Sequence, residues 1–365
     1  MGTITRSFAN NITSGGTFDA TDLTGTIPAS NIADASVTNI TAVPALTAVS
    51  TVASDPPSPD AGQVWYNTTD KALRAYVAGA GSWATGNPLN TGRSGLGGSS
   101  QSGTAALAFG GQNPPMSALT ESYNGTSWTE VADLNTAKSL GVGSGASNTS
   151  ALYSFGESGT GNVATNESWN GSSWTEITDG NTARRFMGGG GTQTSAIVAG
   201  GFTTAVTGVT ETWNGSSWTE VADLNTSRYT LTGTAQNNTN ALVFAGKLPG
   251  GPLYGNTETW NGSSWTEVAD LNTAREGAGG SGASNTSALA MGGEAPAFTG
   301  ATEQWNGTSW TEQNDLNNAR AIPGASGTTS STTAFGGFNP GSSPIYLNDS
   351  EEWTVANVTT DLGVS

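Results

Sequence analysis

The sequence contains no cysteine and no histidine. These absences exclude disulfides, thiolate nucleophiles, imidazole bases and the usual zinc and copper ligand sets. Basic residues are also scarce, because 11 Lys and Arg stand against 28 Asp and Glu and give a net charge of −17. Nucleic-acid binding draws much of its affinity from Lys and Arg, so no nucleic-acid partner is expected. We expect a protein that is not an enzyme and that uses no metal and no cofactor.

Long apolar runs are absent as well. No run of 18 apolar residues occurs, and no basic segment followed by an apolar stretch opens the chain. Neither membrane insertion nor a secretory signal is therefore expected. Glycine, by contrast, is abundant at 52 of 365 residues, about twice its usual share of roughly 7%. This composition favours tight turns and closely packed strands over helices.

An internal repeat is the strongest feature that is present. The run Glu-Thr-Trp-Asn-Gly-Ser-Ser-Trp-Thr-Glu-Val-Ala-Asp-Leu-Asn-Thr occurs at 211–226 and again at 258–273, and the second tryptophans of the copies recur every 44–47 residues. These tryptophans are Trp128, Trp174, Trp218, Trp265 and Trp310, and Trp83 and Trp353 belong to partial copies. A period in this range is typical of units that stack on one another, such as the blades of a β-propeller.

Each repeat predicts four strands. In the second copy these are 140–144, 151–155, 165–169 and 173–177, and Asn-Gly between the last two predicts a type I′ hairpin in which two tryptophans approach each other. Six copies of the second strand predict six blades. Residues 351–353 offer a third strand without a following fourth, and residues 82–83 offer a fourth strand near the start. We expect these N- and C-terminal strands to share one blade and to close the ring.

The chain divides into three predicted domains. Residues 1–60 lack tryptophan and end in a proline-rich turn, which predicts an extended arm that a partner would order. Residues 61–80 predict a β-hairpin, since two β-rich runs flank a polar turn within 63–77. Residues 81–365 contain the repeats and are predicted to form the propeller.

Two resemblances follow from these motifs. The glycine pair after the second strand, the aromatic third-strand position, the tryptophan beyond it and the arginine opening the next unit resemble the kelch repeat over about residues 82–355, which implies a six-bladed propeller. The segment 62–70, with Leu73 and Tyr76 after it and 23–30 before it, is similar to β regions of tailed-phage fibre and other virion appendage proteins.

The second resemblance implies a function and a location. A virion structural protein, a tail fibre or similar appendage, would bind other virion proteins through residues 1–60 and would be exposed on the particle surface. A homo-oligomer, for example a trimer, is expected. The alternatives are a capsid, neck or tail decoration protein without receptor binding, and a bacterial surface adhesin.

Candidate binding residues lie in the variable loops, which we define as the connections between the second and third strands of each repeat. These loops differ in length and composition while the rest of the repeat stays nearly constant, as is typical of recognition loops on a rigid scaffold. We expect them to bind a host cell-surface glycan or protein. The residues concerned are Pro114, Met116, Leu248, Tyr254, Phe298, Phe338, Ile345 and Tyr346.

Charged residues recur at two positions of the repeat. A basic residue opens each unit, at Arg93, Lys138, Arg184, Arg228, Arg275 and Arg320, and a carboxylate begins each third strand, at Glu121, Glu167, Glu211, Glu258, Glu303 and Glu351. The topology brings both positions to the same side of the fold, so we predict a ring of structural ion pairs. The alternative is a cationic collar that binds an anionic sugar or a phosphate.

Overall fold

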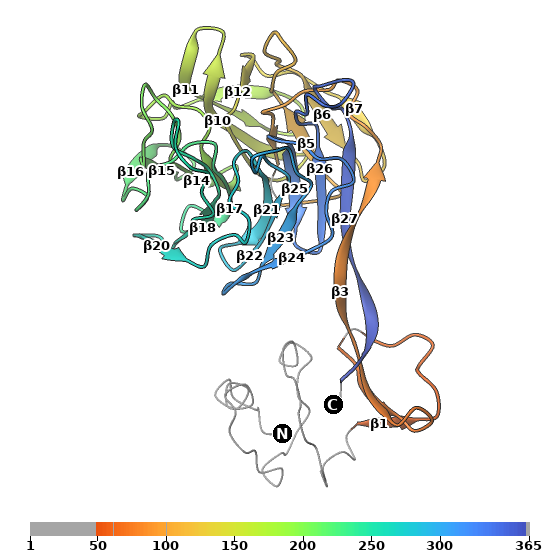
Figure 1. The fold of residues 1–365 in the computed structure, drawn as a ribbon. Coiled ribbons are helices and arrows are strands. Elements are labelled where there is room, and N and C mark those ends of the chain that lie inside the picture. The colour runs from red at the N-terminus through yellow and green to blue at the C-terminus, as the bar shows by residue number, and fades with distance from the viewer. Residues whose placement is uncertain (1–48, 61, 100, 363–365) are drawn as a thin grey trace. The chain divides into compact units, whose positions relative to one another are not determined.

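The computed structural model describes residues 49–60, 62–99 and 101–362 (Figure 1). All regular elements among these residues are β-strands, and none is a helix. The prediction of an all-β fold is confirmed for these described residues.

The described residues form two compact units. Residues 81–354 make up the larger unit, and residues 49–80 and 355–362 make up the smaller one. We expected the last domain to reach residue 365, but residues 355–362 belong to the smaller unit. The reason is that β27 (Ser350–Asp361) continues beside β3 (Ala72–Gly86). Most of the predicted arm, residues 1–48, lies outside the described residues.

Six antiparallel sheets built on one plan make up the larger unit. Sheet 1 contains β4 (Gly97–Gly98), β5 (Leu107–Phe109), β6 (Thr120–Tyr123) and β7 (Trp128–Glu130). Sheet 2 contains β8 (Lys138–Ser139), β9 (Val142–Ser147), β10 (Ser150–Ser158), β11 (Gly161–Trp169) and β12 (Trp174–Ile177). Sheet 3 contains β13 (Gly188–Thr192), β14 (Ser195–Ala199), β15 (Thr210–Trp213) and β16 (Trp218–Val221).

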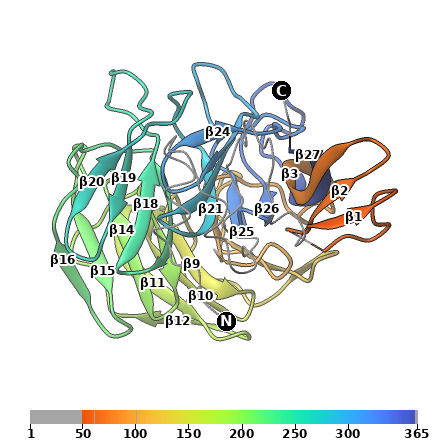
Figure 2. The ribbon, with the colours of Figure 1, turned by 90° about the horizontal axis from the view of Figure 1, so that it is seen from below.

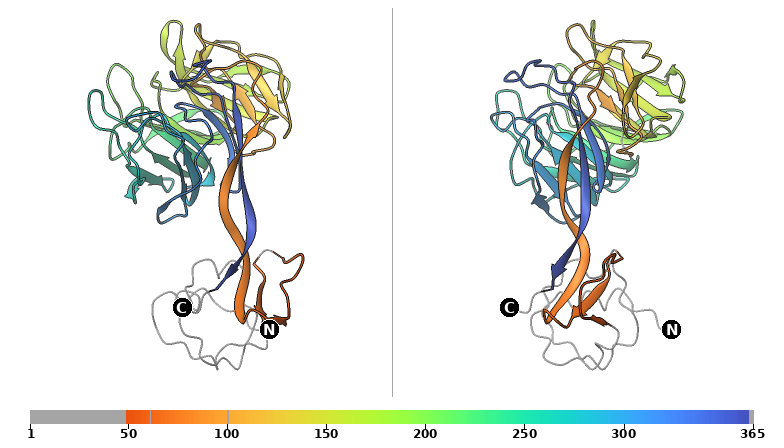
Figure 3. Two further views of the ribbon diagram at one scale, coloured as in Figure 1. Left: turned by 45° about the vertical axis from the view of Figure 1, so that its right-hand side comes forward. Right: turned by 90° about the vertical axis from the view of Figure 1, so that its right-hand side faces the viewer.

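The remaining sheets follow the same order. Sheet 4 contains β17 (Thr232–Asn237), β18 (Asn240–Phe244), β19 (Thr257–Trp260) and β20 (Trp265–Val268). Sheet 5 contains β21 (Gly279–Ser284), β22 (Ser287–Met291), β23 (Thr302–Trp305) and β24 (Trp310–Glu312). Sheet 6 contains β25 (Gly324–Thr328), β26 (Ser331–Phe335), β27 and β3. In sheet 6, β3 from the start of the chain lies beside β27 from its end (Figure 3).

The second strand of each sheet forms the core. In β14 the four residues after Ser195 are buried, because neighbouring sheets cover both faces of the strand. One core cluster joins Ile197 of sheet 3 to Val243, Trp260 and Trp265 of sheet 4. Packing between adjacent sheets therefore supplies the apolar core that a single sheet could not form.

The repeated hairpins bring two tryptophans together but differ from the predicted turn. Trp213 stands opposite Trp218, and their ring centroids are 5.5 Å apart. Asn214 Oδ1 accepts hydrogen bonds from the backbone N–H groups of Ser216 and Ser217. Gly215 has a φ of 93°, whereas Asn214 is not in the left-handed region. The type I′ prediction is therefore wrong, because the asparagine side chain closes a four-residue loop.

Neighbouring sheets are joined in a circular order through their first strands. β4 contacts β9, β9 contacts β13, β13 contacts β17, β17 contacts β21, β21 contacts β25, and β25 contacts β4. Figure 2 labels β9, β21 and β25 of this series, near the middle of the sheets. The tryptophan that opens a fourth strand also bonds to the preceding sheet, as Trp174 Nε1 donates to Thr120 Oγ1 at 3.0 Å. The same bond joins Trp128 to Ser350, Trp265 to Thr210, Trp310 to Thr257 and Trp83 to Thr302.

The smaller unit contains the predicted hairpin. β2 (Val64–Asn67) pairs antiparallel with β3, and β1 (Ser50–Val52) pairs parallel with β2. Asp55 accepts hydrogen bonds from Trp65, Asn67 and Arg74, and Arg74 also bonds to Asp361 of β27. The bond from Arg74 is the largest of the effects that lower the pKa of Asp55 to about 2. Arg74 thus fastens the hairpin to the C-terminal strand.

Candidate functional site

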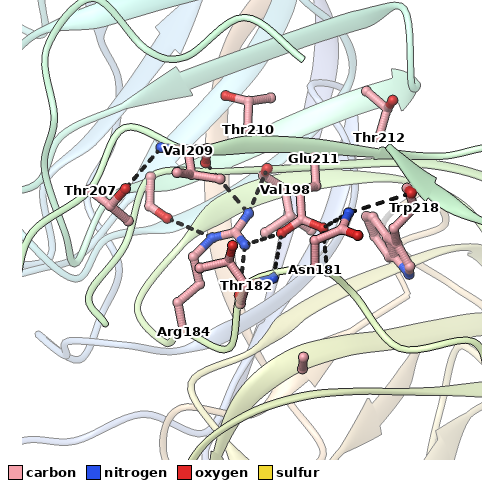
Figure 4. A network of polar contacts seen from close by, with 12 residues as sticks. Asn181, Thr182, Arg184, Val198, Thr207, Val209, Thr210, Glu211, Thr212 and Trp218 are labelled. Carbon is pink, nitrogen blue, oxygen red and sulfur yellow. Dashed lines mark hydrogen bonds and ion pairs between the residues drawn. The ribbon is translucent and has the colours of Figure 1, made fainter. Parts of the chain in front are cut away.

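An ion pair lies at the start of sheet 3. Arg184 precedes β13 and Glu211 is the second residue of β15. Arg184 Nη1 lies 2.5 Å from Glu211 Oε1, and both side chains are fully buried (Figure 4). Arg184 also donates to the backbone oxygens of Thr182, Val198 and Gly200. Burial lowers the pKa of Arg184, and Glu211 partly opposes this effect. The pair is an internal part of the sheet.

The same geometry recurs in four further sheets. The pairs are Arg93–Glu121 at 2.7 Å, Arg228–Glu258 at 2.6 Å, Arg275–Glu303 at 3.0 Å and Arg320–Glu351 at 2.7 Å. Each pair lies within one sheet, and each arginine side chain is fully buried. The alternative of a cationic collar is not supported at these five positions, because their guanidinium groups are buried and already paired.

An asparagine from the preceding sheet completes each of these clusters. Asn181 follows sheet 2, and both its backbone N–H and its side-chain amide donate to Glu211 Oε2 at 2.7 and 2.8 Å. Its amide also donates to Trp218 O of sheet 3. Equivalent bonds to Glu are made by Asn90, Asn135, Asn225, Asn272 and Asn317. This repeated asparagine is therefore a link between sheets, which the sequence prediction missed.

Lys138 of sheet 2 departs from the predicted pairing. Its Nζ donates to Tyr153 O at 3.3 Å and to Thr165 O at 3.0 Å, and no ion pair with Glu167 forms. The ammonium group is a compact charge, whereas a guanidinium group spans several acceptors in a planar fork. Burial lowers the pKa of Lys138 to about 8, although Glu167 partly opposes this shift. The prediction of a pair at Lys138 and Glu167 is wrong.

The variable loops fold back over the starts of the first strands. In sheet 6, Phe338 bridges both Ala321 and Tyr346, and in sheet 5, Glu294 bridges both Glu276 and Phe298. Comparable bridges in sheets 1, 3 and 4 join Ser94, Gln112 and Met116, then Arg185, Phe202 and Val206, and then Tyr229, Lys247 and Leu253. The loops are thereby held against the side of the repeats where the basic residues stand.

The structure brings some of the predicted binding residues together. Phe338 contacts Phe298 and Tyr346, with ring centroids 5.8 and 5.4 Å apart, and the neighbouring Ile345 is 43% exposed. The other predicted residues lie in two different loops. Pro114 is exposed and Met116 half-buried in the loop of sheet 1, while Leu248 and Tyr254 are half-buried in the loop of sheet 4.

A second aromatic cluster was not predicted. Tyr229 contacts Phe186 and Phe202 at centroid distances of 5.9 and 5.6 Å, and the Arg185 guanidinium lies over both phenylalanine rings. Arg185 also pairs with Glu157 at 2.9 Å. These residues stand one or two positions after the basic residue of each unit or in a variable loop. The signal in the sequence that marks them is variation at the two positions after the basic residue of each unit.

Six equivalent turns surround a central cavity. The second residue after each basic residue lies in one of these turns, and we call the six residues together the turn ring. They are Gly95, Leu140, Phe186, Thr230, Gly277 and Ile322. All six have φ between 45° and 62°. Backbone hydrogen bonds of 2.6–3.0 Å join five neighbouring pairs of this ring, including Gly95 N–H to Ile322 O. The cavity is about 120 Å³ in volume, and residues from the first strands and preceding turns of all six sheets line it.

No group of three or more acidic side chains in the described part of the chain is arranged to hold a metal ion. No helix in that part is long and apolar enough to cross a membrane. No protein-family model matches the sequence, and no curated protein sequence matches it.

Proposed function

We propose that the larger unit is a closed six-bladed β-propeller of the kelch-like type, with sheet 6 as the blade that both chain ends share. The circular order of first-strand contacts supports this proposal. So do the tryptophan bonds, because Trp128 of sheet 1 donates to Ser350 of sheet 6 in the same way as Trp174 of sheet 2 donates to Thr120 of sheet 1. A ring of this kind hides the sheet edges that an open array would leave free.

We propose further that the chain is a phage virion protein, a tail fibre or similar appendage, whose variable loops adhere to the host surface. The proposal rests on a contrast between two parts of the repeat. In one part polar side chains bond to one another, and in the other apolar side chains remain partly exposed. The repeated Arg, Glu and Asn side chains bond to one another, as Arg184, Glu211 and Asn181 do. The variable loops instead present half-buried and exposed aromatic and apolar side chains, among them Tyr346 and Ile345.

Adhesion by such a protein would depend on copy number. Weak contacts made by one propeller become strong when several copies on one particle engage the surface together. In this proposal residues 1–60 attach the chain to other virion proteins and promote assembly of a homo-oligomer, for example a trimer. The smaller unit would then connect the attachment segment to the propeller.

The test exchanges the variable loops of sheets 5 and 6 for short glycine-serine turns and measures adsorption of the particle to host cells. We expect adsorption to fall while the particle still assembles. A matched control changes the exposed hairpin residues Ser216 and Ser263 to alanine, because these lie in the conserved hairpins at the other end of the strands.

Each outcome has a definite meaning. Unchanged adsorption after loop exchange would favour a capsid, neck or tail decoration protein over a receptor-binding one. Proteomics of purified particles tests the location of the chain. If the chain is missing from particles and present on the bacterial surface, the protein is an adhesin of the bacterium instead.

A further inference from the structure

We propose that residues 355–361 of β27 form a contact between two copies of this chain, in which the two strands pair antiparallel, edge to edge. β26 pairs with β27 only from Ser350 to Thr354. Beyond Thr354, β27 has β3 as its one neighbour among the described strands. The other side of this segment is therefore an unpaired sheet edge, and such an edge is a template for another strand.

The sequence of this edge has no feature that would keep another strand away. It reads Val-Ala-Asn-Val-Thr-Thr-Asp, with no proline and with no charge before Asp361. Val358 is 44% exposed and is one of two large apolar side chains that are exposed in the described part of the chain. Valine and threonine also favour strands. The segment is thus better suited to pairing with a strand than to contact with water.

The fourth strands of sheets 1–5 are also edges, and they are protected. Each carries an exposed glutamate, and these are Glu130, Glu176, Glu220, Glu267 and Glu312. Charged side chains on an edge disfavour pairing with another chain. At the opposite end of the sheet that contains β27, β1 has only three residues, and a short strand offers little to pair with. The contrast marks the β27 edge as a contact surface.

The sheet is also narrow where this edge is free. β2 pairs with β3 only from Ala72 to Ala75, so β3 and β27 continue as a two-stranded ribbon. A two-stranded ribbon is marginally stable in water, whereas three or more strands can form a stable sheet. β3 has a free edge there as well, but its residues 78–80 are Ala-Gly-Ala, which have low strand propensity. Pairing of two β27 edges would join two ribbons into four strands.

The backbone of the segment can pair with a second copy of itself. Leu362 N–H donates to Leu73 O of β3. In an antiparallel ladder the backbone groups of successive residues point to opposite sides, so those of residues 355, 357 and 359 face the free edge. A two-fold axis at Val358 then places Asn357 of one copy opposite Thr359 of the other. These two residues form a hydrogen-bonded pair, and the axis generates a second such pair.

The side chains are also compatible with pairing to the same sequence. In this register Val358 lies opposite itself and Asp361 lies opposite Val355. Like charges directly opposite each other would destabilise a strand pair, and this register brings none together. The condition is important because each chain carries a net charge of −17, so copies repel unless they meet through an uncharged surface. A symmetric pair of this kind closes and adds no further copies.

The test is a disulfide trap in the full chain, which contains no cysteine of its own. Val358→Cys places one thiol at the proposed two-fold axis. Opposite residues of a non-hydrogen-bonded pair have Cα atoms about 4.5 Å apart, within the range of about 4.4–6.8 Å that disulfides span. We expect Val358→Cys to form a covalent dimer several times faster than Ile345→Cys. Ile345 is the matched control, because it is 43% exposed but lies in a variable loop.

A second substitution separates the pairing of copies from the folding of the strand. The N–H of Thr359 faces the free edge, so Thr359→Pro removes a bond between copies and leaves the bonds to β3 in place. Added to Val358→Cys, it should reduce covalent dimer formation to the rate of the Ile345→Cys control. An unchanged thermal unfolding midpoint would show that the variant folds.

Two results would overturn the proposal. One is covalent dimer formation by Val358→Cys that is no faster than that of Ile345→Cys, which would also follow if residues 1–48 of the same chain occupied the edge. The other is fast dimer formation that persists when Thr359→Pro is added. The proposed adhesion is tested separately, because loop exchange leaves β27 unchanged and Thr359→Pro leaves the variable loops unchanged.

Discussion

Sheets 2 and 3 share four strands in the same order. They differ in the buried polar side chains that link these strands to one another and to the next sheet. In sheet 3 a buried Arg184 meets a buried Glu211, and Thr210 accepts a hydrogen bond from Trp265 of the next sheet. In sheet 2 Lys138 and Asn166 stand at the positions equivalent to Arg184 and Thr210. By analogy with the bond from Trp265 to Thr210, Trp218 Nε1 of sheet 3 would donate to the side chain at position 166. No such bond forms, and both Trp218 Nε1 and Asn166 Oδ1 lack a hydrogen-bond partner.

Sheet 2 also has the most extended hairpin on the loop side. β10 and β11 pair as far as Ser158 and Gly161, whereas the equivalent strands of sheet 3 end at Ala199 and Thr210. The tip of this hairpin contacts sheet 3, where Asn162 Nδ2 donates to the backbone oxygens of Phe202 and Thr203. Sheet 2 therefore lacks the buried ion pair and the bond from Trp218, and it is also the sheet whose loop-side hairpin extends onto its neighbour.

The largest expected difference between the two sheets concerns the buried carboxylates. Glu211→Gln leaves Arg184 charged and buried without its counter-ion, and removing one partner of a buried ion pair costs about 3–5 kcal/mol. Glu167→Gln in sheet 2 removes a carboxylate that accepts bonds from Asn135 and Thr136 but pairs with no cation. It should cost about 1–2 kcal/mol. Urea unfolding measures both, and equal losses would contradict the comparison.

Alkaline pH should distinguish Lys138 from the arginines. The pKa of Lys138 is lowered from 10.5 to about 8 in the folded chain. Between these values the unfolded chain binds more protons than the folded one, so stability rises with pH by about 1.4 kcal/mol per unit. Lys138→Met lacks this group. The difference in unfolding free energy between wild type and Lys138→Met should therefore change from pH 8 to pH 10, and a constant difference would contradict the assignment.

The tryptophan bonds between sheets provide a third comparison. Thr210→Val keeps the shape of the side chain but removes the acceptor for Trp265 Nε1. A buried donor left without a partner costs about 1–3 kcal/mol. Thr210→Ser retains the hydroxyl and serves as the control. If the valine variant unfolds at the same urea concentration as the serine variant, the hydrogen bond does not contribute to the sheet contact.

The smallest expected effect is a repair of sheet 2. Asn166→Thr supplies a hydroxyl for Trp218 Nε1 and removes the unpaired Asn166 Oδ1, but it also removes the amide bonds to Ala164 O and Thr178 O. We expect a net gain of about 0.5 kcal/mol, since Thr178 is exposed and its carbonyl can bind water. A higher thermal midpoint would agree with this expectation, and a lower one would show that the amide bonds matter more.

Recurrence in the sequence made the scaffold predictable. A basic residue and a glutamate recur in every unit at the positions of Arg184 and Glu211, so their approach across one sheet could be foreseen, as could the meeting of Trp83 with Trp353. The role of Asn181 was missed because its contacts reach the next sheet, and a single repeat does not reveal them.

The candidate site was less predictable because its contacts also join different repeats. Variation marked the loops but could not show which side chains meet. The bridge from Arg185 to Phe202 and the contact of Phe186 with Tyr229 join residues from different loops and sheets. The central cavity belongs to no single repeat, because it arises only when all six first strands come together.

The central claim is that the repeats build a scaffold and that the variable loops bind the host. The most direct measurement is the binding of the labelled full chain to host cells, compared between the chain with exchanged loops in sheets 5 and 6 and the chain with Ser216→Ala and Ser263→Ala in the conserved hairpins. We expect the loop variant to lose binding and the hairpin variant to bind like wild type. Binding that persists in the loop variant, or that is lost in the hairpin variant alone, would contradict the claim.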